Sequence, residues 1–118
     1  MNEKKLLIEN LILSMLAIDD ETAGLLIKDA PRLDEETKKR LRWPFLNIDI
    51  SEYDILDVLK GLRDAKLLEC VIEDGKRPFE GSFEQIPTEA DNYDVWFRIT
   101  ESGKNRLEDT NNLIWTDK

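Results

Sequence analysis

The side chains of this chain that could do chemistry are its carboxylates and one thiol. The sequence has 26 aspartates and glutamates, one cysteine and no histidine. The absence of histidine excludes Ser-His-Asp triads, Cys-His pairs and histidine metal sites. Cys70 lies within an apolar stretch, and the carboxylates of Glu69 and Glu73 disfavour the charged thiolate that a nucleophile requires. There is no glycine-rich phosphate loop, so we predict that the protein is not an enzyme and uses no cofactor.

Three consecutive carboxylates, Asp19, Asp20 and Glu21, precede an apolar stretch that we predict to be a helix. Carboxylates favour the partial positive charge at a helix N-terminus, which explains this cluster without a ligand. The alternative is a site for a divalent cation. We favour the capping interpretation and predict no metal.

The one concentrated basic run consists of Lys38, Lys39, Arg40 and Arg42. It follows Asp34, Glu35 and Glu36 at the four-residue spacing that lets side chains pair along a helix, so a self-paired helix from 34 to 42 is one interpretation. Two alternatives remain open, namely contact with nucleic-acid phosphates, together with Lys60, or contact with an acidic protein partner.

A long acidic stretch carries the remaining candidates for binding. Between Glu73 and Asp94 there are seven acidic and two basic residues. Phe79, Phe83 and Ile86 lie within it, and Trp96 follows, alternating away from its apolar neighbours. We predict that these four residues dock on a basic, partly apolar partner. The alternative is that the apolar ones fold back over the neighbouring strands. The polar composition of the loop predicts rapid amide exchange across residues 81–92.

The elements that must position these residues indicate an α+β fold that is mainly helical. Helices are predicted over 4–18, from 20 to 30, 34–42, from 51 to 66 and 101–109, with strands over 67–72 and 94–100. Residues 1–109 form one domain and 110–118 a C-terminal tail. The first helix is apolar on nearly all sides, so it is either a core helix or one that also forms a homodimer seam at Leu13 and Leu16.

Two stretches carry a resemblance to a known family. YDILDVLKGLRDAKLLECVI, residues 53–72, resembles the recognition helix and first wing strand of PadR-like and MarR-like transcriptional regulators. WFRITESGKNRLE, residues 96–108, is similar to their last wing strand and the helix after it. The resemblance implies a winged helix-turn-helix with a two-stranded antiparallel wing. It departs from those families at Ala65-Lys66, where a glycine is usual, and in a longer loop from 43 to 50.

The family resemblance implies DNA binding, but the charges oppose it. The net charge is -9, and the side of the predicted recognition helix that faces away from the core carries Tyr53, Asp57, Lys60 and Asp64. Those carboxylates would repel phosphates. We therefore predict a non-catalytic acidic module that acts through protein–protein contacts, as a homodimer through its first helix. The alternative is a DNA-binding transcriptional regulator of the PadR/MarR-like type.

The sequence contains no stretch typical of a membrane span or a signal peptide. The longest apolar run, from Leu11 to Ile18, is far shorter than the roughly 20 residues that span a bilayer. The segment before it lacks the cleavage site of a signal peptide. We expect a cytoplasmic protein with no membrane partner.

Overall fold

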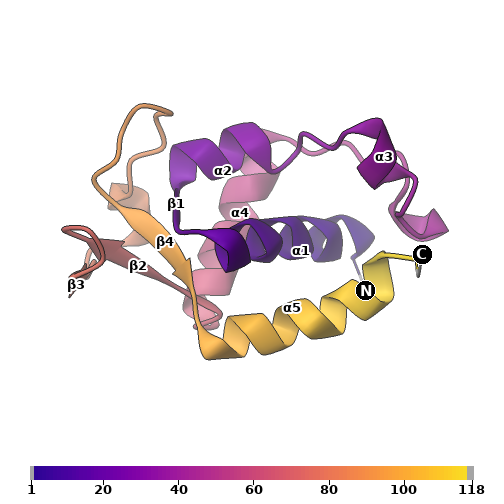
Figure 1. Cartoon of the computed structure of the whole chain (residues 1–118). Helices are drawn as coiled ribbons and strands as arrows, with labels where there is room; N and C mark the ends of the chain where they lie inside the picture. The colour runs from indigo at the N-terminus through magenta and orange to yellow at the C-terminus, as the bar shows by residue number, and fades with distance from the viewer. Residues whose placement is uncertain (1, 117–118) are drawn as a thin grey trace.

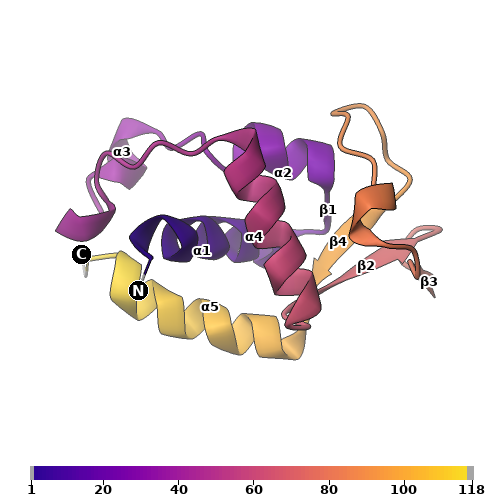
Figure 2. The same ribbon diagram turned by 180° about the vertical axis from the view of Figure 1, so that it is seen from behind.

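The computed structural model describes residues 2–116, and within them helices and short strands follow one another along the chain (Figures 1 and 2). In order they are α1 (Glu3–Ile18), β1 (Glu21–Thr22), α2 (Ala23–Asp29), α3 (Glu35–Lys38), η1 (Trp43–Phe45), α4 (Glu52–Asp64), β2 (Leu68–Ile72), β3 (Arg77–Pro78), η2 (Phe83–Gln85), β4 (Trp96–Ile99) and α5 (Glu101–Ile114). The predicted α+β class is confirmed. No helix within residues 2–116 is long and apolar enough to cross a membrane.

Helix α1 is the centre of the packing, which explains why it is apolar on nearly all sides. One of its faces packs against α4 and β4, and another against α5 and η1 (Figures 1 and 2). The larger core includes Ile8 and Ile12 of α1 with Phe97 of β4, and the smaller includes Leu7 with Ile114. A helix covered on two sides needs apolar residues on both.

The predicted homodimer seam at Leu13 and Leu16 is wrong. Leu13 is 0% exposed and Leu16 is 3% exposed inside one copy of the chain. Both belong to the larger core, so neither side chain can reach a second copy.

The sheet is antiparallel with strand order β1-β4-β2-β3. β2 and β4 fall within the predicted strands, and Cys70 pairs with Phe97 between them. Strands β1 and β3 were not predicted, because each has two residues and no alternating pattern to detect. The turn after β2 uses Asp74 and Gly75, both with positive φ, as the Asp-Gly dipeptide indicates.

Helix α4 forms as its sequence predicts. Ser51 and Asp54 make a capping box, in which each side chain accepts a hydrogen bond from the other's backbone N–H. Four apolar residues at helical spacing share one face of α4, and all are buried, namely Ile55, Val58, Leu59 and Leu62.

Helix α5 continues to Ile114, so the predicted helix end at Asp109 is wrong, and residues 110–114 are helical instead of tail. The extension is held by the buried Asn10 of α1. Its Nδ2 donates to Thr110 Oγ1 at 3.0 Å and to Asn111 Oδ1 at 2.8 Å. Trp115 Nε1 donates to Asn10 Oδ1 at 2.9 Å. The last two residues of the predicted tail, 117 and 118, lie outside the described residues.

Candidate partner-binding groove

The segment between β3 and β4 is packed on the body of the protein instead of projecting from it. Ile86 is 6% exposed and belongs to the larger core, and Phe79 and Phe83 pack against that core. Arg63 of α4 donates from Nη2 to the carbonyl oxygen of Gly81 at 2.7 Å, and its guanidinium lies over the Phe79 ring. The predicted use of Ile86 as an exposed docking residue is therefore wrong, and for Ile86 the fold-back alternative holds. Phe79 and Phe83 are only partly buried, so their use as docking residues stays a prediction.

The far end of this segment rests on α2. A Cβ added to Gly24 would lie 2.3 Å from the carbonyl oxygen of Glu89, so a glycine is required for this close approach of two backbones. The segment is thus anchored at both ends, on α4 through Arg63 and on α2 through Gly24.

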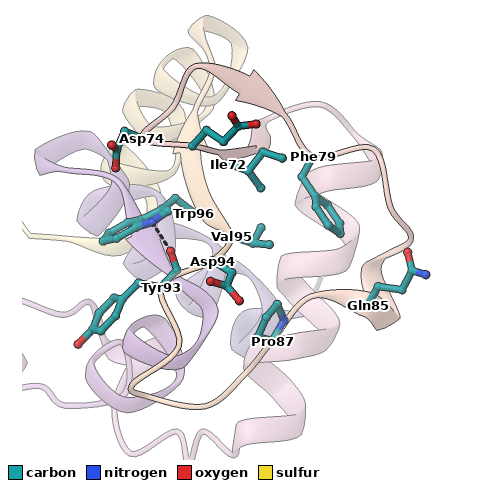
Figure 3. A pocket seen from close by; sticks show the side chains of 10 residues that line it. Ile72, Asp74, Phe79, Gln85, Pro87, Tyr93, Asp94, Val95 and Trp96 are labelled. Atoms are coloured by element: carbon teal, nitrogen blue, oxygen red, sulfur yellow. Dashed lines mark hydrogen bonds between the residues drawn. The ribbon is translucent and has the colours of Figure 1, made fainter.

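A groove remains between this segment and the sheet, with a volume of about 590 Å³ (Figure 3). Its lining combines aromatic, aliphatic and acidic side chains: Ile72, Glu73, Asp74, Phe79, Gln85, Pro87, Tyr93, Asp94, Val95 and Trp96. Figure 3 shows Tyr93 and Trp96 on one side, Phe79 on the other, and Ile72 and Val95 between them. Of the four predicted docking residues, the structure thus places Phe79 and Trp96 together in this groove.

Tyr93 and Trp96 form a fixed aromatic wall. Trp96 Nε1 donates to the backbone oxygen of Tyr93 at 2.8 Å (Figure 3). The two rings stack with centroids 6.0 Å apart. Trp96 is half-buried and Tyr93 is exposed, so this wall presents aromatic surface to an incoming side chain.

The groove has an excess of negative charge. Glu73 is paired with Arg77 at 2.7 Å, and Arg98, in the neighbouring strand β4, is paired with Asp20 at 3.0 Å. Within residues 2–116, Asp74 and Asp94 form no ion pair. Their two carboxylates are exposed and free to meet a cation.

The residues proposed for phosphate contact do not converge on one surface. Lys60 of α4 pairs with Glu84 at 3.1 Å, and that hydrogen bond raises the pKa of Lys60. The basic run Lys38–Arg42 belongs to α3 and the chain just after it, at the other end of the molecule from the segment that carries Glu84 (Figures 1 and 2). Helix α3 ends at Lys38, well short of the predicted 42. Its pairs have three-residue spacing, Glu35–Lys38 and Glu36–Lys39, both at 3.7 Å.

The acidic cluster Asp19–Glu21 is divided among separate structural roles. Thr22, and not a carboxylate, caps α2, while Asp20 binds Arg98 and Glu21 lies in β1. Burial, and then the neighbouring carboxylates, raise the pKa of Glu21. Across residues 2–116, no three or more His, Cys, Asp or Glu side chains gather in a way that could hold a metal ion.

Cys70 should be unreactive in the folded protein. Burial raises the pKa of its thiol to about 11, Glu69 adds to the rise, and Arg63 opposes it. At pH 7.5 the thiolate fraction is then on the order of one in a thousand or less. We expect iodoacetamide to leave the native protein unmodified over a period that fully alkylates glutathione, and to modify the urea-unfolded chain. Native alkylation at the glutathione rate would contradict this environment.

Asp74, Tyr93 and Asp94 line the groove but were not predicted from the sequence as binding residues. The alternation of a strand places Asp94 and Trp96 on one face, and that pattern could have found Asp94. Nothing local predicts that the turn at Asp74 lies beside them, because the pairing of β2 with β4 brings the two together.

Comparison of the chain with protein-family models, with curated proteins and with solved structures gave no match. What the groove can do therefore follows from its own shape and charge. An aromatic wall beside two free carboxylates suits a side chain with an apolar stem and a cationic head, which is the chemistry of arginine and lysine.

Proposed function

We propose that this protein is a non-catalytic winged-helix module that binds a basic, partly apolar segment of a protein partner in the groove. The observation that carries the proposal is the stacked Tyr93–Trp96 wall next to the free carboxylates of Asp74 and Asp94. The element order supports the winged-helix part, because α4 leads directly into β2 and the sheet joins β1, β4 and β2.

In this proposal an arginine or lysine of the partner lays its stem along Trp96 and directs its charge toward Asp94. A cation over an exposed aromatic face contributes about 0.5–1 kcal/mol. Aromatic residues in a well-formed pocket are also the usual anchors of protein interfaces. The groove is small, so we expect a weak contact with a Kd of about 10–100 µM.

The contacts on α4 favour this function over DNA binding. Reading a major groove needs free basic side chains around the recognition helix. Lys60 and Arg63 are both engaged by the segment between β3 and β4. The exposed side of α4 is left with acidic residues, among them Asp57 and Asp64.

The proposal is tested by fluorescence anisotropy with a labelled peptide of alternating arginine and leucine, at about 150 mM salt. Replacing Trp96 with alanine should weaken binding at least about tenfold, because it removes half of the aromatic wall. Tyr53→Ala is the matched control, since Tyr53 is an exposed aromatic residue on α4. We expect its affinity to equal that of the wild type.

Two results would overturn the proposal. One is equal affinity of the wild type and a folded Trp96→Ala protein for the arginine peptide. The other is equal binding of a peptide in which every arginine is replaced by glutamate. Binding of a random DNA duplex in the low micromolar range at about 150 mM salt would instead favour the regulator alternative.

A further inference from the structure

The end of the molecule opposite the groove carries an ordered basic and aromatic projection. It consists of Lys38, Lys39, Arg40, Arg42 and Trp43, all exposed. Trp43 is 83% exposed, which is unusual for so large an apolar side chain. The projection and the groove lie at opposite ends of the molecule, whose longest dimension is 40 Å (Figures 1 and 2).

The backbone holds this projection in place on both sides of Trp43. Leu41 and Phe45 are buried in the smaller core. The N–H of Arg42 donates to the carbonyl oxygen of Ile114 at 2.8 Å, and the N–H of Thr116 donates to the carbonyl oxygen of Arg40 at 2.7 Å. The anchored residues lie on either side of Arg42 and Trp43, whose side chains are exposed to solvent. The exposure of Trp43 is therefore a fixed feature of the fold.

The projection has the chemistry that the groove is suited to bind. It offers a guanidinium next to an indole, and the groove offers two free carboxylates next to a stacked aromatic wall. Lys38 and Lys39 are paired with Glu35 and Glu36 at 3.7 Å, so the charge that the basic end can offer a partner comes from Arg40 and Arg42, which form no ion pair within residues 2–116.

We propose that the occupant of the groove is the Arg42–Trp43 projection of a second copy of this chain. This inference rests on the proposed function of the groove. The indole of Trp43 stacks on the Tyr93–Trp96 wall, and the guanidinium of Arg42 meets Asp74 and Asp94. Because the two surfaces are different and lie at opposite ends, the contact is head-to-tail. The pair then retains one free groove, on one copy, and one free projection, on the other.

The net charge of -9 does not prevent this contact at physiological salt. The Debye length there is about 8 Å, so charges spread over a much longer molecule are largely screened from one another. The local charges at the contact are of opposite sign and attract. Raising the salt concentration should therefore weaken self-association, whereas a contact made by apolar burial alone would not weaken.

The test uses two variants, each damaged at one end. Asp74→Asn/Asp94→Lys removes the negative charge of the groove, with asparagine chosen because residue 74 has positive φ. Arg42→Gln/Trp43→Ala removes the projection. All four side chains are exposed, so both proteins should fold. Sedimentation velocity is measured up to about 300 µM for each protein and for their equimolar mixture, with Tyr53→Ala as the control.

We expect the wild type and the control to grow in mass with concentration, beyond a dimer. Each damaged variant alone should remain a monomer. The mixture should form dimers and nothing larger, because one variant supplies the only intact groove and the other supplies the only intact projection. A monomeric wild type that still binds the arginine peptide would overturn this inference and leave the proposed function standing. If the wild type neither self-associates nor binds the arginine peptide, both this inference and the proposed function are wrong. A dimer in either variant alone would also contradict the head-to-tail contact.

Discussion

Replacing Leu13 with aspartate is expected to unfold the protein at every protein concentration. The side chain of Leu13 is 0% exposed within the core that joins α1 to α4 and β4. Loss of a buried leucine costs about 2–5 kcal/mol, and an unpaired buried carboxylate costs several more. A domain of this size is stable by only about 5–15 kcal/mol.

Circular dichroism and urea titration measure the effect, and Leu113→Asp is the matched control. Leu113 lies on α5 and is 47% exposed, so its free energy of unfolding should change by about 0.5 kcal/mol or less. A folded, monomeric Leu13→Asp protein would contradict the core position and restore the dimer seam.

Removing residues 80–92 and joining the ends with a short turn should also cost the protein most of its stability. The polar composition of this stretch predicts a dispensable loop, but the deletion removes Ile86 from the core and the Gly81 acceptor from Arg63. Ile86→Ala alone should lower the free energy of unfolding by about 2–4 kcal/mol. Glu80→Ala, an exposed neighbour, should be neutral.

Hydrogen exchange in the intact protein gives a second measurement of the same packing. The N–H of Gln85 donates to the carbonyl oxygen of Ser82 at 3.0 Å, and the N–H of Ile86 donates to that of Phe83 at 3.1 Å. Both lie within the segment that is anchored on α4. We expect these amides to be protected, in contrast to the rapid exchange that composition predicts. Rapid exchange across the segment together with a stable deletion protein would show that it contributes nothing to the core.

The parts of the fold predicted from sequence are those with a local physical cause. The capping box at Ser51, the single apolar face of α4 and the Asp-Gly turn each depend on a few adjacent residues. The long apolar α1 indicated a covered helix, but not that both its faces are covered within one copy.

The parts that were missed depend on contacts between distant residues. Asn10 reads as a polar edge of α1, and only its bonds to Thr110 and Asn111 show why α5 runs past Asp109. The many carboxylates of the segment from 79 to 92 predict an exposed loop. The segment is instead held on the protein by the burial of Ile86 and by the hydrogen bond from Arg63 to Gly81. The sequence predicted Trp96 as a docking residue from its alternation away from its apolar neighbours. It contacts Tyr93 of the loop, and its position in the groove is what the proposed function uses.

The most direct test of the binding groove is a ¹⁵N NMR titration of the Arg42→Gln/Trp43→Ala protein with the arginine–leucine peptide, because this variant cannot dock on itself. We expect the indole N–H of Trp96 and the amides of Asp74 and Asp94 to shift together and saturate. The indole N–H of Trp115, which is bonded to Asn10, should stay in place. Shifts confined to the exposed side of α4, with the Trp96 indole unmoved, would contradict the claim that this groove is the binding site.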